Sequence, residues 1–285
     1  MTSGSASLEC CVDLPMSDST AKKVTIREIV KMKRDGNRIV VVTAYDVLFA
    51  KLVDAAGVDM VLVGDSLGNV VAGFDSTLPV TLEHMIYHGA AVRRGVKRAL
   101  LVVDMPFLSY QASEELAILN CGRVMQETGA DAVKVEGGSE EMVRTVGRLT
   151  RTGIPIVAHL GFTPQSVRTL GMRVQGREEV EAQRMIDQAR MLEDGGAFSL
   201  VLELIPTELA ARISEAISIP TIGIGAGPKC DGQVLVLPDL LGLNDGFEPK
   251  FLKKYADLAG TVKTAVQRFG EEVRSGAYPD AEHSN

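Results

Sequence analysis

ALLVVD, residues 99–104, is a short apolar run, rich in branched residues, that ends on an acid. Other runs have the same form and end on an acid or a histidine: MVLVGD (60–65), DAVKVE (131–136), IPIVAH (154–159) and SLVLE (199–203). Each is followed by a segment with the pattern of a helix, which is typical of buried parallel strands. Side chains at the carboxyl ends of such strands line the active-site mouth of an α/β barrel. The runs therefore predict ionisable groups gathered at one rim.

Strand and helix patterns alternate along most of the chain. The expected strands are 39–43, 60–64, 99–103, 132–135, 155–158, 199–202, 220–224 and, with the weakest pattern, 233–237. The expected helices are 25–33, one starting near 46, then 81–94, 113–128, 140–152, 180–194, 208–217 and 250–273. Seven or eight such βα units predict a single (β/α)8 TIM barrel.

An open doubly wound sheet is the alternative to a closed barrel. Two observations favour closure. Polar residues follow at least five successive strands, whereas an open sheet would gather them at one switch point. The first strand is also not followed by GxGxxG, which weakens a nucleotide-binding interpretation.

Length and composition indicate one large domain. The chain has 285 residues, and 46% of them are hydrophobic, so a sizeable core can form. The barrel, including its N-terminal helix, is expected over residues 25–275. Residues 1–24, with Ser, Thr, Gly and mixed charge, are expected to be a disordered or loosely packed extension, and 276–285 a polar tail.

Charge, hydropathy and cysteine usage exclude several classes of protein. A formal charge of −7 argues against a nucleic-acid partner, which would favour a basic face. No stretch reaches the ~18 uncharged apolar residues of a membrane span. Cys10, Cys11, Cys121 and Cys230 form no CxxC pair, so free thiols in a reducing, cytoplasmic compartment are expected.

Asp65, Asp104 and Glu136 end three consecutive strands and should be spatial neighbours. Three nearby carboxylates repel one another, and a hard divalent cation relieves that repulsion. Without a cluster of Cys or His, Mg²⁺ is a better candidate than Zn²⁺. The alternative is that each acid caps the following helix or pairs with a base.

Lys134, His159 and Glu203 complete the predicted rim. Lys134 and Glu136 are two residues apart on one strand, so they share a face, and an inward lysine needs an anion. That anion is either a substrate carboxylate or a neighbouring acid. His159 is a base, a ligand, a hydrogen-bond donor to substrate or a structural residue. Glu203 lies across the mouth, where it is either a general acid–base or a carboxylate at a helix N-terminus.

Several motifs together resemble the ketopantoate hydroxymethyltransferase family. They are GDSLG (64–68), DSTLPVT (75–81), DMPF (104–107), KVEGG (134–138), HLGFTPQS (159–166), VQGR (174–177) and GIGAG (223–227) followed by CDGQVLV (230–236). They occur in the family's order and span about residues 25–263, nearly the whole chain.

The resemblance implies a barrel of the phosphoenolpyruvate mutase and isocitrate lyase superfamily. It implies Mg²⁺ at Asp65, Asp104 and Glu136, and a 2-oxo acid bound by Asp65, Ser66, Asp104 and Lys134, with His159 near the substrate. Glu203 matches the family's catalytic acid–base. The activity implied is transfer of a hydroxymethyl group from 5,10-methylenetetrahydrofolate to 3-methyl-2-oxobutanoate through an enolate stabilised by Mg²⁺, in pantothenate biosynthesis. Members of the family commonly form homodecamers.

The chain departs from the family pattern at four places. Leu108 replaces glycine in DMPFGSY, Phe74 and Pro238 each replace histidine, and the segment near Met172 is one residue shorter. None of these positions is a proposed metal ligand or acid–base. Leu108 and the shortened loop are expected at the rim, so they are expected to affect folate fit and loop motion.

Two other functions remain as alternatives. A magnesium-dependent lyase, mutase or aldolase of the same superfamily would share the barrel and the metal site. The KKCGH motif of isocitrate lyases is absent from the sequence. The second alternative is a catalytically inactive barrel kept for assembly, against which the retained Asp65, Asp104, Lys134, Glu136 and Glu203 argue.

Overall fold

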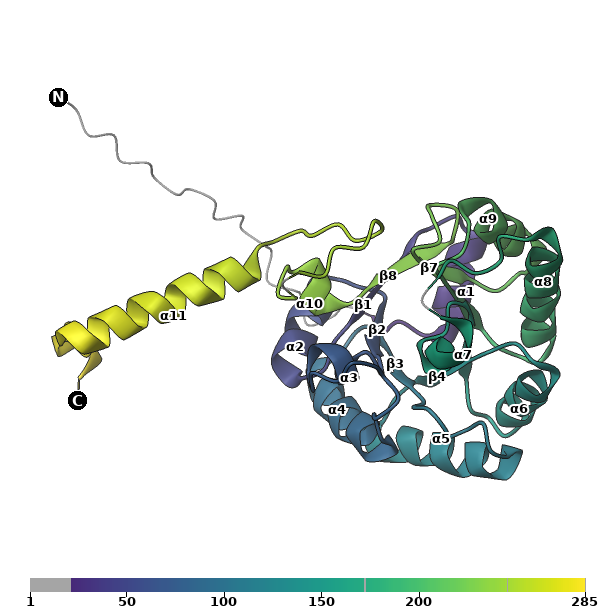
Figure 1. Cartoon of the computed structure of the whole chain (residues 1–285). Coiled ribbons are helices and arrows are strands. Elements are labelled where there is room, and N and C mark those ends of the chain that lie inside the picture. Colours follow the sequence, from purple (N-terminus) through teal and green to yellow (C-terminus); the bar gives the residue numbers. More distant parts are fainter. Residues whose placement is uncertain (1–21, 172, 245, 285) are drawn as a thin grey trace.

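Eight parallel strands close into a barrel in sequence order, with β1 paired to β8 (Figure 1). They are β1 (Ile39–Thr43), β2 (Met60–Val63), β3 (Leu100–Asp104), β4 (Ala132–Glu136), β5 (Ile156–Gly161), β6 (Ser199–Glu203), β7 (Thr221–Ile224) and β8 (Gly232–Leu235). This computed structural model describes residues 22–171, 173–244 and 246–284 of the chain. The predicted (β/α)8 barrel is confirmed.

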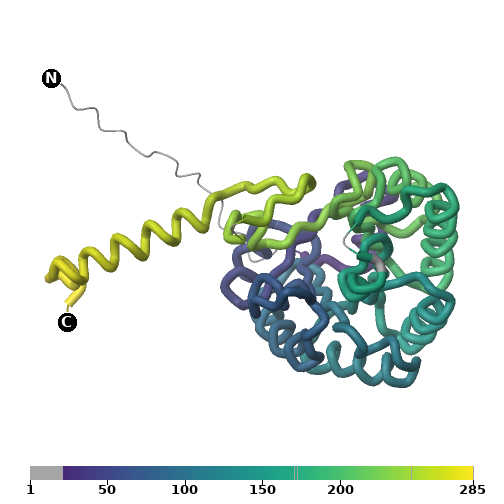
Figure 2. Tube along the Cα trace, viewed as in Figure 1, coloured from purple at the N-terminus to yellow at the C-terminus, as the bar shows by residue number. Residues whose placement is uncertain are grey.

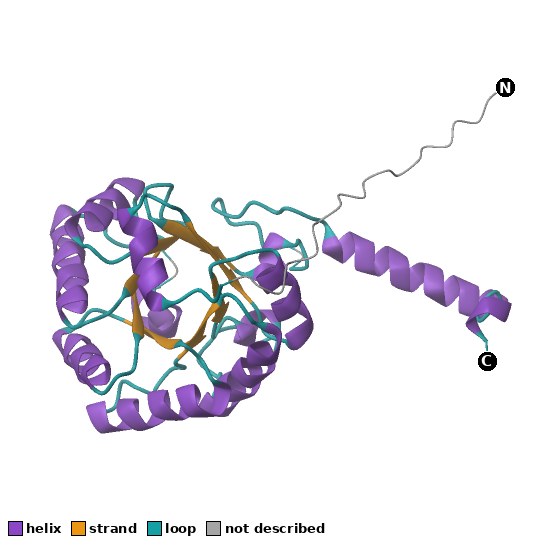
Figure 3. Ribbon diagram, turned by 180° about the vertical axis from the view of Figure 1, so that it is seen from behind, coloured by secondary structure: helices purple, strands orange, loops and turns teal. Residues whose placement is uncertain are grey.

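Helices surround the ring of strands, and the chain passes around the barrel in sequence order (Figures 2 and 3). The helices of the described residues are α1 (Ile26–Arg34), α2 (Val47–Ala55), α3 (Leu67–Val70), α4 (Leu82–Gly95), α5 (Glu114–Thr128), α6 (Glu140–Arg151), α7 (Val167–Leu170), α8 (Glu179–Asp194), α9 (Thr207–Ala216), α10 (Leu237–Leu240) and α11 (Leu258–Ser275), with 3-10 turns η1 (Pro164–Ser166) and η2 (Ala281–His283). Of these, α11 lies apart from the ring (Figure 1). Most of the apolar core lies between the strands and these helices.

A second, smaller apolar cluster fills the barrel interior and is closed at the amino end by α1. Ile29 of α1 is fully buried in this cluster with Ile39, Leu100 and other inward strand residues. Thr25 begins α1 with a capping box, because its hydroxyl accepts the N–H of Glu28 while the Glu28 carboxylate accepts the N–H of Thr25. This end of the barrel is therefore packed and apolar.

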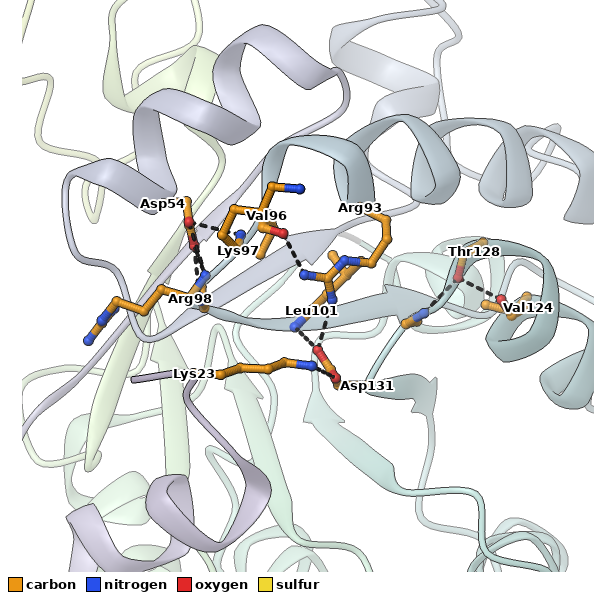
Figure 4. Close-up of polar contacts among 12 residues, drawn as sticks. Lys23, Asp54, Arg93, Val96, Lys97, Arg98, Leu101, Val124, Thr128 and Asp131 are labelled. Carbon is orange, nitrogen blue, oxygen red and sulfur yellow. Dashed lines mark hydrogen bonds and ion pairs between the residues drawn. The ribbon is translucent and has the colours of Figure 1, made fainter. Parts of the chain in front are cut away.

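Two buried or half-buried aspartates fix the chain at the amino end of β3 (Figure 4). The Asp54 carboxylate accepts the N–H of Lys97 at 2.9 Å and that of Ala99 at 2.7 Å. Asp131 accepts the N–H of Leu101 at 3.0 Å and pairs with Arg93 at 3.2 Å. Hydrogen bonds from a charged acceptor are stronger than neutral ones, so β3 is held in register and its other end is placed accurately.

Strands β3 to β6 extend further at their carboxyl ends than the sequence predicts. Asp104 lies opposite Lys134, and Glu136 lies opposite His159, within the pairing of adjacent strands. Glu203 likewise lies opposite Gly161. These ionisable residues are therefore part of the sheet itself, which holds their backbones more rigidly than loops would.

The last helix differs from the prediction. It begins at Leu258 instead of residue 250, because Asp257 is its N-cap and accepts the N–H of Gly260 at 3.0 Å. No residue of α11 is buried, and the helix projects away from the barrel (Figures 1 and 3). On the outer face of β1, Val40 is 49% exposed, whereas Val42 is buried. Residues 1–21 of the predicted extension and Met172 lie outside the described residues.

Candidate active site

The seven residues predicted for the site lie on, or directly after, five neighbouring strands. Asp65 and Ser66 follow β2, Asp104 ends β3, Lys134 and Glu136 are on β4, His159 is on β5 and Glu203 ends β6. Ser66 and Glu203 are half-buried, and the other five residues are buried. The structure brings all seven to the mouth at the carboxyl end of the barrel.

Lys134 and Asp104 form a buried ion pair at the centre of the mouth. Lys134 Nζ lies 2.7 Å from Asp104 Oδ1 and 3.9 Å from Glu136 Oε1. Burial lowers the pKa of Lys134, but the carboxylates of Asp104 and Glu136 outweigh burial and raise it above its ordinary value. The other oxygen of Asp104, Oδ2, accepts the N–H of Asp65 at 3.0 Å. The lysine is therefore charged and faces an acid.

His159 lies between two glutamates. Its Nδ1 is 3.5 Å from Glu136 Oε1, and its Nε2 is 3.4 Å from Glu203 Oε2. Burial lowers the pKa of His159, yet the contacts with both carboxylates outweigh burial and raise it to about 9. Neither ring nitrogen has a well-formed hydrogen bond among the described residues. The imidazolium thus orients Glu203 while leaving its carboxylate half-exposed at the mouth.

Gln165, which was not predicted, connects two of the acids. Its Nε2 donates to Asp65 Oδ2 at 3.0 Å and to the Met105 carbonyl at 2.9 Å, and its backbone N–H donates to Glu136 Oε2 at 3.1 Å. Its Oε1 accepts from the Tyr110 hydroxyl at 2.8 Å and from Gln111 Nε2 at 2.9 Å. Both ends of the amide are satisfied, so its orientation is fixed.

Tyr110 is the second residue that sequence reasoning missed. Its hydroxyl accepts the N–H of Glu136 at 3.0 Å while donating to Gln165, and its side chain is fully buried. Gln165 lies within the quoted motif HLGFTPQS, and Tyr110 lies three residues beyond DMPF. The sequence could have drawn attention to Gln165 and Tyr110 as polar residues in or beside these motifs. Their separation in sequence does not reveal that their side chains are in contact.

The charge of the site suits a divalent cation. Burial, together with the repulsion from the carboxylates of Glu136 and Asp104, raises the pKa of Asp65 to about 8. Glu136 Oε1 and Asp104 Oδ1 are buried without a hydrogen bond among the described residues, although Lys134 pairs with the latter. Carboxylate oxygens are the donors that Mg²⁺ prefers.

The side chains are nevertheless not arranged as a finished metal site. In the described part of the chain, no group of three or more His, Cys, Asp or Glu residues is placed so that it could hold a metal ion. Lys134 pairs with Asp104 Oδ1, and Gln165 donates a hydrogen bond to Asp65 Oδ2. A cation bound by these carboxylates would have to replace both contacts. The donor set fits Mg²⁺ in chemistry, and side-chain rotation would be needed to bind it.

Two residues at the rim have positive φ although neither is glycine. Leu108 has φ 62° and is 59% exposed, and Leu204, directly after Glu203, has φ 46°. Such a conformation costs free energy in residues with a Cβ. The pattern of the family that the chain resembles has glycine at position 108, and a left-handed backbone is the conformation that glycine adopts without this cost.

Comparisons with known proteins agree on one family. The family model described as ketopantoate hydroxymethyltransferase matches residues 23–281. A 3-methyl-2-oxobutanoate hydroxymethyltransferase of Pelobacter propionicus is 56% identical over 94% of this chain and 99% of the relative. Proteins of that name from Syntrophus aciditrophicus and Moorella thermoacetica are 52% and 54% identical, over 94% and 92% of this chain and 98% and 97% of their own lengths.

Solved structures share the fold at low sequence identity. A phosphonopyruvate hydrolase in complex with oxalate and Mg²⁺ matches with a TM-score of 0.60 and 12% identity, covering 91% of this chain and 93% of the other. A 2,3-dimethylmalate lyase, a member of the PEP mutase/isocitrate lyase superfamily, matches with a TM-score of 0.57 and 15% identity over 91% of each chain. No helix in the described residues has the length and apolarity needed to cross a membrane. From the family model and the identity to its relatives, the chain belongs to the ketopantoate hydroxymethyltransferase family of transferases.

Proposed function

We propose that this chain transfers a hydroxymethyl group from 5,10-methylenetetrahydrofolate to 3-methyl-2-oxobutanoate, giving 2-dehydropantoate for pantothenate biosynthesis. The observation that carries the proposal is identity of 50–56%, over at least 92% of the chain, to relatives named 3-methyl-2-oxobutanoate hydroxymethyltransferase. The ionisable residues at the barrel mouth support it, because they supply both a place for a 2-oxo acid and a base beside it.

Substrate binding is assigned to the acids and the lysine of the mouth. Asp65, Asp104 and Glu136 would hold Mg²⁺, which supplies positive charge to the oxygens of a 2-oxo acid when it is bound. Lys134 offers its ammonium group to the substrate carboxylate, while Ser66, 2.9 Å from the Tyr45 hydroxyl, offers a hydroxyl beside Asp65. Burial of these groups strengthens their electrostatic interactions with an anionic substrate.

Glu203 is proposed to move the proton. Its carboxylate is half-exposed at the mouth and held on β6, and His159 keeps it oriented from 3.4 Å. Glu203 takes the proton from C3, and the electron pair passes to the keto oxygen to give an enolate. C3 then attacks the methylene carbon of the carrier. Two C–N bonds join that carbon to the carrier, and one of them breaks as C3 adds. The other breaks when water supplies the hydroxyl group of the product, and the two nitrogens take up the C3 proton and the second proton of the water, which leaves tetrahydrofolate.

Self-association is proposed on the basis of exposed apolar surface. Val262, Val266, Phe269 and Val273 recur along one face of α11, and each is at least 46% exposed. Burying this stripe against other copies would stabilise an oligomer, and the family resemblance suggests a homodecamer. The buried free thiols Cys121 and Cys230 support a reducing compartment such as the cytoplasm.

Hydrogen exchange at C3 of 3-methyl-2-oxobutanoate tests the proposal directly. The protein in D2O should exchange the C3 proton in the presence of Mg²⁺, and should form 2-dehydropantoate when methylenetetrahydrofolate is added. Absence of exchange under every condition would refute the enolate step. Exchange without transfer of the one-carbon unit would favour the aldolase or lyase alternative.

A further inference from the structure

Two cavities meet at the rim of the barrel between α6 and α8. The inner cavity has a volume of about 400 Å³ and the outer one about 540 Å³. They share four lining residues, Gly138, Ser139, Arg184 and Gln188. We call the continuous depression the rim groove. Its combined size suits a long ligand, since cavities of 300–1,000 Å³ commonly bind small molecules.

The inner cavity of the rim groove adjoins the candidate active site. Glu136 and Gln165 form part of its wall, and these are the residues that connect to Asp65 and His159 in the barrel mouth. A ligand in the inner cavity would therefore lie against Glu136 and one side chain away from Asp65 and His159. A co-substrate that delivers a group to the mouth needs such a position.

The lining of the inner cavity suits a flat heterocycle with several hydrogen-bonding groups. Phe107, Met142, Leu160 and Met185 supply apolar surface. Glu181 and Gln188 also line it, and neither has a hydrogen-bond or ion-pair partner among the described residues. A carboxylate can accept two parallel hydrogen bonds from adjacent N–H groups of a planar ring. The 2-amino-4-oxo edge of a pterin presents such a pair.

Arg184 lies where the two cavities join and has no acidic partner in the described part of the chain. Among the described residues that line the rim groove, it alone is basic. The acids of the outer cavity are Glu140 and Asp187, and Asp187 is already paired with Arg190 at 3.7 Å. An anionic group of a ligand would consequently bind at Arg184.

We propose that the rim groove binds the one-carbon carrier, with the reduced pterin in the inner cavity against Glu181 and a glutamate carboxylate of the tail at Arg184. This inference rests on the proposed function, which names the carrier. It adds the place where the carrier binds and assigns separate residues to its head and its tail.

Calorimetric binding of two carriers to the full-length protein, with Mg²⁺ and 3-methyl-2-oxobutanoate present, tests the assignment. The probes are tetrahydrofolate and 6-methyltetrahydropterin. The second has the same reduced pterin ring but lacks the p-aminobenzoyl-glutamate tail. Arg184→Gln should weaken tetrahydrofolate binding about tenfold and leave the pterin unchanged, because a hydrogen bond to a charged group is lost. Glu181→Gln should weaken the binding of both ligands by similar factors.

Arg144→Gln is the matched control, since Arg144 is exposed on α6 and lines neither cavity. Thermal unfolding of Arg184→Gln should match the wild type, because the side chain has no partner to lose. If tetrahydrofolate binds the wild type and Arg184→Gln equally well, the groove is not the carrier site although the proposed function stands. If the wild type neither binds tetrahydrofolate nor forms 2-dehydropantoate, the proposed function fails and the inference fails with it.

Discussion

Lys134 Nζ lies 2.7 Å from Asp104 Oδ1, and both side chains are almost completely buried. Removing one partner of a buried ion pair leaves an uncompensated charge and costs about 3–5 kcal/mol. Lys134→Met should therefore lower the free energy of unfolding by about that amount, as measured by urea denaturation. The double variant Lys134→Met/Asp104→Leu should recover part of the loss. Equal stability of wild type and Lys134→Met would mean that the pair is not formed.

Glu203 is expected to affect turnover without affecting metal binding. Glu203→Gln keeps the size of the side chain but removes the base, and general base catalysis typically contributes 10²–10⁴-fold to the rate. We expect kcat and C3 exchange to fall by about that range while the Kd for Mg²⁺, measured by calorimetry, stays within about twofold. A large loss of Mg²⁺ affinity would place Glu203 among the metal ligands instead.

Magnesium should stabilise the folded protein. Three carboxylates share the buried mouth, and burial with the repulsion from Glu136 and Asp104 raises the pKa of Asp65 to about 8. A cation that binds only the folded state at 100 times its Kd contributes about 2.7 kcal/mol. The unfolding temperature should rise when Mg²⁺ is added to EDTA-treated protein. Asp104→Asn should reduce this rise, and an equal rise in the variant would contradict the assigned ligands.

Gln165 should hold η1 and α7 against the acids of the barrel mouth, because it hydrogen-bonds to Asp65 and Glu136. Replacing it with leucine leaves Tyr110 and Gln111 without their acceptor and removes a donor from Asp65, so we expect a loss of about 1–3 kcal/mol in unfolding free energy. Trypsin should also cleave faster after Arg168, which is exposed on α7. Gln126→Leu, at an exposed position of α5, is the control and should change neither measurement.

The contrast between Lys134 and Gln165 explains what the sequence could predict. Lys134 and Glu136 share a face because side chains alternate along a strand, so local periodicity was enough to place them together. Gln165 reaches Asp65 across 100 positions of sequence, through a 3-10 turn whose path no local pattern defines. Residues on regular strands were therefore predictable, whereas those that meet through loops needed coordinates.

The last helix was predicted only in part, for a related reason. The sequence predicts a helix over about 250–273, but an apolar stripe on such a helix suits packing on the chain's own barrel as well as on another copy. In the structure α11 projects from the barrel with its apolar stripe exposed (Figure 1). Periodicity indicates that one face will be covered and does not identify the surface that covers it.

That stripe gives a final prediction about assembly. Phe269→Glu places a charge in the middle of the apolar face, next to Val262, Val266 and Val273, and burying an unpaired charge is costly. The oligomer should dissociate, as measured by sedimentation velocity, while the barrel keeps its fold because no residue of α11 is buried. Thr264→Glu is the charge-matched control, since position 264 lies on the opposite face at 100° per residue. If Phe269→Glu and Thr264→Glu give the same assembly as the wild type, α11 is not the contact between copies. If both variants dissociate the oligomer, the apolar stripe has no special role in assembly.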